Sequence, residues 1–155
     1  MECGKAGDDA ADDHAAAFVE AVLHLDHFPQ HPVTRHDLDL YHTVATVKMP
    51  ESCRFVFGQG VADIVFEAGL DHFNFRELDP GACFGRVATD CPMPIQVWDE
   101  AGREVSSSYF EVREGRLVTR RIVTPSMLTR DEQVIRQDCL CYLMERLPYL
   151  PTADA

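Results

Sequence analysis

Short β-type segments separated by turn residues occupy the middle of the sequence, and they restrict the fold more than any other feature. These segments are rich in Val, Ile, Phe and Trp, and prolines, glycines and acidic residues separate them. Strands joined by tight turns lie antiparallel, so the last three segments predict an antiparallel meander. The strands expected in this region are residues 84–89, 95–98, 105–112 and 117–123.

The preceding part of the chain predicts three more strands. Residues 38–49 alternate in part between apolar and polar side chains and end at Pro50. Residues 53–57 and 61–67 lie on either side of Gly58-Gln59-Gly60. Two β-rich segments around a glycine-containing turn of this length are typical of a hairpin.

Helical periodicity appears near both ends of the chain. In residues 10–28, Ala11, Ala15, Phe18, Val22 and Leu25 recur at spacings of four and three, which predicts an amphipathic helix. Residues 130–147 predict a second helix, because Thr129 and Glu132 have capping-box spacing. Its segment 139–144 is apolar around most of the cylinder, which indicates burial between layers or contact with a partner.

These elements predict an α+β fold. The expected architecture is an antiparallel, curved sheet of six to seven strands, flanked by an N-terminal and a C-terminal helix. Residues 1–9 are expected to form a disordered acidic leader, residues 10–148 a single α+β domain, and residues 149–155 a C-terminal tail.

The charge balance excludes some classes of partner. The 155 residues carry a formal net charge of -12. Such acidity argues against general nucleic-acid binding and against adsorption to an anionic membrane. The sequence shows no export signal and no apolar segment long enough for a membrane span, so we expect a cytoplasmic protein. Its six cysteines include no CxxC motif and are expected to be reduced, structural thiols.

A histidine cluster is the candidate metal site. Five of the seven histidines fall between residues 24 and 42, interleaved with aspartates. Ligands could be drawn from His24, His27, His31 and Asp37. The spacing matches no defined zinc signature, so a solvated, pH-sensitive patch is the favoured interpretation and no metal is expected.

Acid–base chemistry has three candidate residues. His72 follows Asp71, which could orient its ring, and Asp63 and Glu67 are four residues apart on a predicted strand. Solvated carboxylates are the simpler interpretation. Nucleophile elbows, Walker loops and dinucleotide-binding motifs are missing from the sequence, so no cofactor is expected and an enzyme is disfavoured.

Arginines cluster between residues 113 and 130. Arg116, Arg120 and Arg121 are therefore candidates for binding a carboxylate or phosphate group. Arginines in an acidic sheet protein more often pair with acids on adjacent strands, and we favour this internal role.

The leading functional hypothesis is a small acidic binding or regulatory protein, either chaperone-like or inhibitory, that holds a protein partner or forms a homodimer. Small secretion chaperones have a similar size, acidity and helix–strands–helix order. The surface expected to bind is the apolar part of the C-terminal helix. Its residues are Leu140, Tyr142, Leu143, Met144 and Leu147.

The alternative is a cavity-containing protein. The segment SSSYFEVREGRLVTRRIV (residues 106–123) resembles the closing hairpin of NTF2-like domains. This resemblance covers roughly a tenth of the chain, and the long helix expected after the last strand departs from the family's common pattern. It implies a small-molecule-binding protein or a cofactor-independent isomerase, dehydratase or hydrolase. His72, Asp63 and Glu67 would then be the acid–base residues.

Overall fold

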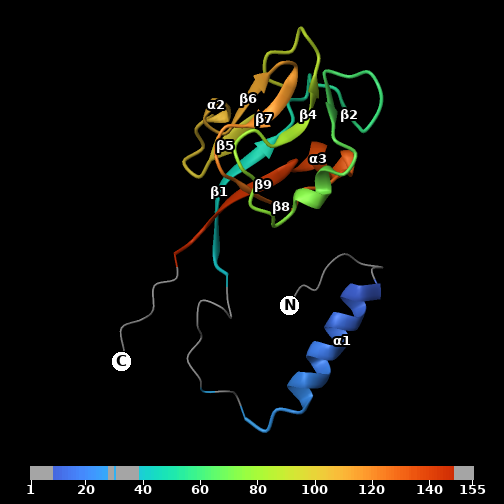
Figure 1. Ribbon diagram of the computed structural model, residues 1–155, viewed down its shortest axis with the longest axis vertical. Helices are drawn as coiled ribbons and strands as arrows, with labels where there is room; N and C mark the ends of the chain where they lie inside the picture. Colours follow the sequence, from blue (N-terminus) through green and yellow to red (C-terminus); the bar gives the residue numbers. More distant parts are fainter. Residues whose placement is uncertain (1–8, 28–29, 31–38, 149–155) are drawn as a thin grey trace. The chain divides into compact units, whose positions relative to one another are not determined.

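The computed structural model describes residues 9–27, 30 and 39–148 (Figure 1). The chain divides into two units, Met1–Thr34 and Arg35–Ala155, and each is described here by itself. The expected tail and nearly all of the expected leader lie outside the described residues, so those predictions, and that of one domain over residues 10–148, stay predictions.

The first unit contains the expected N-terminal helix, α1 (Asp9–Leu23). Its alanine content favours a helix, and Asp9 and Asp12 in the first turn interact favourably with the positive end of the helix dipole. The helix ends earlier than residue 28. The Nδ1 atom of His24 lies 2.8 Å from the carbonyl oxygen of Glu20, so a side chain binds a carbonyl group of the last turn.

The second unit has two sheets (Figure 1). The first is antiparallel, with strands in the order β5-β1-β9-β8, and the second is mixed, in the order β2-β3-β4-β7-β6. The α+β class is therefore confirmed, while the single curved sheet is wrong. The strands are β1 (Tyr41–Lys48), β2 (Phe55–Phe57), β3 (Ile64–Phe66), β4 (Cys83–Val87), β5 (Gln96–Asp99), β6 (Phe110–Arg113), β7 (Arg116–Thr119), β8 (Thr124–Ser126) and β9 (Cys141–Arg146).

Both sheets contribute to one hydrophobic core. Val47 and Leu143 enter it from the first sheet, and Phe66 and Phe84 enter it from the second; all four are almost fully buried. Three short helices connect the strands. They are η1 (Leu70–Phe73), α2 (Ser106–Tyr109) and α3 (Glu132–Gln137).

The predicted C-terminal helix is wrong over most of its length. The helix α3 ends at Gln137, and residues Cys141–Arg146 form strand β9. Over residues 141–143 the burial alternates with the two-residue period of a strand, and Met144 is buried as well. An apolar segment of this length fits either structure by composition, and its pairing with β1 decides the outcome.

The cap of α3 also differs from the prediction. Asp131 is the N-cap residue, and its Oδ1 atom accepts hydrogen bonds from the backbone N–H groups of Gln133 (2.9 Å) and Val134 (3.2 Å). Thr129, the expected cap, instead accepts a hydrogen bond from the N–H of Asp131. A carboxylate at this position stabilises the helix start more strongly than a hydroxyl group, because it also interacts with the helix dipole.

The predicted hairpin around Gly58 is wrong as well. Strands β2 and β3 pair in parallel, with Phe55 opposite Ile64. Parallel strands normally need a long crossover, but strands of three residues span only about 10 Å. Gly58 and Gly60 have φ angles of 76° and 136°, which other residues rarely adopt, and they allow residues 58–63 to return to the start of β2.

The predicted meander is only half present. The β6–β7 hairpin is confirmed, with Glu114 and Gly115 at positive φ in its turn. Strand β5 instead pairs with β1 in the other sheet, and the segment expected to be a strand from residue 105 begins with α2. The Ser106 hydroxyl accepts a hydrogen bond from the Val97 N–H (2.8 Å), so α2 takes the place of a neighbouring strand beside β5.

Gly85 provides a test of the close packing between β3 and β4. A Cβ atom at this position would lie 2.5 Å from the Val65 carbonyl oxygen and 2.8 Å from the Phe66 Cα atom. We expect Gly85→Ala to lower the free energy of unfolding by about 1–3 kcal/mol, because backbone must move to relieve the overlap. Urea denaturation measures this change.

The matched control is Gly69→Ala. Gly69 has a φ of -105°, and its nearest neighbour would be the exposed His72 ring at 3.3 Å, which can move. Equal stability losses in the two variants would contradict the steric explanation.

Candidate functional site

The histidine cluster is only partly described. His31 and Asp37 lie outside the described residues, and the ring of His24 is bound to the Glu20 carbonyl group. Among residues 9–27, 30 and 39–148, no group of three or more His, Cys, Asp or Glu side chains is arranged to hold a metal ion. In the same ranges, no helix is long and apolar enough to cross a membrane.

The three acid–base candidates have separate surroundings. His72 lies in η1, and Asp71, its expected partner, forms an ion pair with Arg130 at 3.2 Å. The Glu67 carboxylate accepts a weak hydrogen bond from the Cys83 thiol (3.9 Å). The Asp63 carboxylate accepts hydrogen bonds from the backbone N–H and the guanidinium group of Arg54. Each acid therefore has its own partner, and the expected pairing of Asp71 with His72 is not made.

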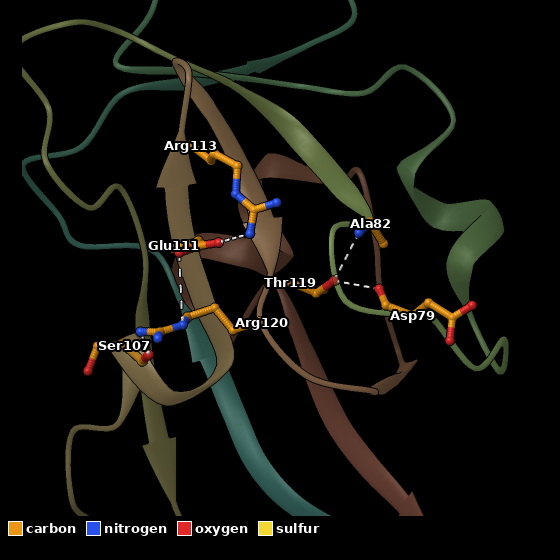
Figure 2. A network of polar contacts seen from close by, with 7 residues as sticks. All are labelled: Asp79, Ala82, Ser107, Glu111, Arg113, Thr119 and Arg120. Carbon is orange, nitrogen blue, oxygen red and sulfur yellow. Dashed lines mark hydrogen bonds and ion pairs between the residues drawn. The ribbon is translucent and has the colours of Figure 1, made fainter.

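Most of the arginine cluster is paired internally. Figure 2 shows Arg113 and Arg120 on either side of the Glu111 carboxylate, with Arg120 also donating to the Ser107 carbonyl oxygen at 2.8 Å. Arg121 forms an ion pair with Glu145 at 2.9 Å and stacks over the Tyr109 ring. Two of the three anion-binding candidates, Arg120 and Arg121, thus already have carboxylate partners.

Arg116, the third candidate, belongs to a row of arginines across the second sheet. In the strand register it lies opposite Arg86 on one side and Arg113 on the other. Residues directly opposite each other share a face of the sheet, and like charges in these positions repel. All three side chains are exposed, and Glu111 partly offsets the repulsion through its contact with Arg113.

The helix α1 carries a continuous line of apolar side chains. We call Ala11, Ala15, Phe18, Val22 and Leu25 the apolar stripe; Leu25 lies in the turn that follows the helix. Spacings of four and three residues place them on one face. No residue of α1 is buried, and Phe18, Val22 and Leu25 are 48 %, 44 % and 48 % exposed. The sequence predicted this stripe correctly.

A second feature, which the sequence analysis missed, is an open pocket of about 220 Å³ that we call the thiol pocket. Cys53 and Cys91 both line it, and the Cys53 thiol donates a weak hydrogen bond to the Arg54 carbonyl oxygen (3.8 Å). Cys53 is nearly buried, whereas Cys91 is half-buried. The remaining lining residues are Pro50, Ser52, Asp63, Asp90, Pro92 and Met93.

The backbone holds the two thiols in place. Each cysteine ends a tight turn, with the Cys53 N–H bound to the Pro50 carbonyl and the Cys91 N–H bound to the Ala88 carbonyl (3.0 Å each). Asp63 connects the two turns. Its carboxylate accepts a hydrogen bond from the Arg54 N–H (2.7 Å), and its carbonyl oxygen accepts one from the Ala88 N–H (2.9 Å).

The charges around the pocket act on its ionisable groups in opposite directions. Hydrogen bonds from the Arg54 backbone and side chain lower the pKa of Asp63, which therefore stays ionised. Burial raises the pKa of Cys53 to about 11, and the nearby Cys91 and Asp63 add to the increase. Burial also raises the pKa of Cys91. Both thiols are consequently protonated at neutral pH.

Comparisons of the chain with protein-family models, curated proteins and solved structures find no significant match.

Thr119 offers a test of the polar network drawn in Figure 2. Its buried hydroxyl group donates to the Asp79 carbonyl oxygen (2.8 Å) and accepts from the Ala82 N–H (3.0 Å), which fixes the turn before β4 to strand β7. We expect Thr119→Val to lower the free energy of unfolding by about 0.5–1.5 kcal/mol, because two part-buried backbone groups lose the hydroxyl group as a partner. Chemical denaturation measures the loss, and Thr119→Ser should restore most of it.

The raised pKa of Cys53 predicts slow alkylation. A change from the ordinary value of 9.0 to about 11 reduces the thiolate fraction at pH 8 about 100-fold. Quantitative mass spectrometry with iodoacetamide should therefore show Cys53 reacting at least that much more slowly in the native protein than in the urea-unfolded protein. Native and unfolded rates within a factor of about three would contradict the burial argument.

Proposed function

We propose that this protein is a non-catalytic binding protein that inserts the apolar stripe of α1 into a complementary groove of a basic protein partner. The observation that carries the proposal is the exposed stripe itself. Phe18, Val22 and Leu25 are large apolar side chains on a helix with no buried residue. Continuous apolar surface of this kind marks an interaction site more often than isolated exposed residues do.

The spacing of the stripe fits a known mode of recognition. Amphipathic helices bind grooves through anchors at positions i, i+4 and i+7, which are here Phe18, Val22 and Leu25. Ala11 and Ala15 extend the same line toward the N-terminus, where small side chains allow close approach of the two backbones. Full burial of a Phe, Val or Leu side chain contributes about 1.5–3 kcal/mol each, so the three anchors would offset much of the free-energy cost of association.

The charge of the segment indicates the chemistry of the partner. Residues 9–27 contain five acidic residues and no lysine or arginine. A groove with a basic rim would complement this pattern and would increase the rate of association at low ionic strength. A basic partner is therefore favoured over a second, equally acidic copy of this chain.

The proposal moves the binding surface away from the C-terminal segment. Leu140 and Leu143 are fully buried and Met144 is 9 % exposed, so these residues belong to the core of the second unit. Tyr142 is half-buried, and only Leu147 among the expected residues is exposed. The helical surface on which the original prediction depended does not exist, whereas α1 offers one of the same kind.

A photocrosslinking experiment tests the proposal. A photoreactive phenylalanine analogue at Phe18 of the full chain should form covalent adducts with one basic protein, which mass spectrometry identifies. The captured protein is then purified and titrated against the chain by calorimetry. Val22→Glu should weaken binding at least tenfold, because loss of one anchor and burial of a charge exceed about 1.4 kcal/mol.

Ala17→Glu is the matched control. Ala17 lies on the polar side of α1, in line with Asp13, Glu20 and His24, so the same charge change should leave the dissociation constant unchanged while preserving helicity by circular dichroism. Equal weakening by both variants would overturn the proposal. So would a wild-type chain that forms a dimer sensitive to Val22→Glu, or a stripe already protected from solvent in the free monomer.

A further inference from the structure

The thiol pocket brings together two cysteines that are distant in the sequence. Cys53 lies in the turn before β2 and Cys91 in the segment between β4 and β5, yet both residues line the same pocket. The pocket beside them is open to solvent and large enough for a small oxidant. We propose that Cys53 and Cys91 are a redox-active thiol pair, which hydrogen peroxide converts into an intramolecular disulfide.

The surroundings of the pair favour an intramolecular reaction. Asp63 links the two turns. Its carboxylate accepts a hydrogen bond from the Arg54 N–H, and its carbonyl oxygen accepts one from the Ala88 N–H. Arg136 of α3 donates to the carbonyl oxygens of Pro50 (3.0 Å) and Cys53 (2.7 Å), and it stacks on the Phe55 ring. Two thiols held beside one pocket by fixed turns have a high effective concentration toward each other.

The two cysteines differ in their access to the pocket, and this difference assigns their roles. Cys91 is half-buried and faces the pocket, whereas Cys53 is 6 % exposed. The Cys53 thiol is also engaged in a weak hydrogen bond to the Arg54 carbonyl oxygen (3.8 Å). Cys91 is therefore the sulfur that meets the oxidant, and Cys53 is the resolving thiol.

The reaction balances with one peroxide molecule. The Cys91 thiolate attacks one peroxide oxygen, the O–O bond breaks, and a sulfenic acid and hydroxide form. The Cys53 thiolate then attacks the Cys91 sulfur, the S–O bond breaks, and a second hydroxide leaves as the disulfide forms. Protons released by the two thiols convert the hydroxides to water. The thiols lose two electrons, and the peroxide gains them.

The same environment keeps the pair reduced until an oxidant arrives. Burial raises the pKa of both thiols, and Asp63 and Asp90 face Cys91 with negative charge, so little thiolate is present at neutral pH. Arg136 acts in the opposite direction on Cys53 but less strongly than burial. A low thiolate fraction slows the attack on peroxide, so we expect the pair to be oxidised only when the peroxide concentration is raised.

Peptide mapping after peroxide treatment tests the proposal. The reduced full chain is exposed to hydrogen peroxide, alkylated and digested without reductant. We expect a linked peptide that joins Cys53 to Cys91, and an intact mass lower by two hydrogen atoms. Cys53→Ser should abolish the link and leave a sulfenic acid on Cys91, which dimedone traps. Cys83→Ser, which removes a half-buried thiol on β4 instead, should form the link as the wild type does.

Several results would overturn the proposal. These are a linked peptide that joins two molecules, a link that forms equally between other cysteines, or the same loss of free thiols in Cys53→Ser and the wild type. If Cys53→Ser does not fold, the wild type is treated with phenylarsine oxide, which bridges two neighbouring thiols. Protection of Cys53 and Cys91 together from alkylation supports the pair, and protection of neither overturns it.

Discussion

The pairing of β1 with β9 is the interaction on which the folded part of the chain depends. It joins the first strand of the second unit to the last, with Tyr41 opposite Arg146 and Val47 opposite Cys141. The ladder extends beyond both strands, because the Leu140 N–H binds the Val47 carbonyl and the Leu147 N–H binds the Leu40 carbonyl (2.8 Å each). The outer strands β5 and β8 attach to this central pair, so the first sheet does not exist without it.

The C-terminal segment that ends in β9 also helps to hold the wall of the thiol pocket in place. The short helix α3 directly precedes β9, and Asp131 caps its start. From α3, the Arg136 guanidinium reaches the carbonyl groups of the Cys53 turn. The C-terminal segment therefore supplies both the central strand of one sheet and the cation that fixes the pocket wall. A chain that lost the β1–β9 ladder would lose the orientation of Cys53 as well.

The sequence predicted the elements that depend on neighbouring residues and failed where distant residues decide. Helix α1 and the β6–β7 hairpin follow from local periodicity and turn chemistry, and both are present. Residues 141–146 have no local preference strong enough to distinguish helix from strand, and only β1, almost a hundred positions earlier, makes them a strand. The parallel β2–β3 pair escaped prediction because strands this short relax the usual need for a long crossover.

The two candidate sites, the apolar stripe and the thiol pocket, also differ in how far the sequence alone predicts them. The apolar stripe is visible in the sequence because helical spacing alone places its residues on one face. Nothing in the local sequence connects Cys53 with Cys91. The two cysteines lie in separate turns, and hydrogen bonds to Asp63 hold these turns together. Internal pairing of the arginines followed from composition, but the particular partners, such as Glu145 for Arg121, depend on the β1–β9 closure that positions β9.

The folded unit and α1 differ in how their charged side chains are paired. Within residues 39–148, the arginines at positions 54, 103, 113, 120, 121, 130 and 146 all form ion pairs with acids. Residues 9–27 contain no lysine or arginine, so their five acids have no such partners there. A helix of 15 residues is near the length at which isolated helices become marginal. Its N-terminal aspartates and alanines favour the helix, but Asp9 and Asp13 repel each other at a spacing of four. Under the proposed function, a basic groove that covers the stripe would relieve this repulsion and bury the apolar face at once, so binding would also stabilise the helix.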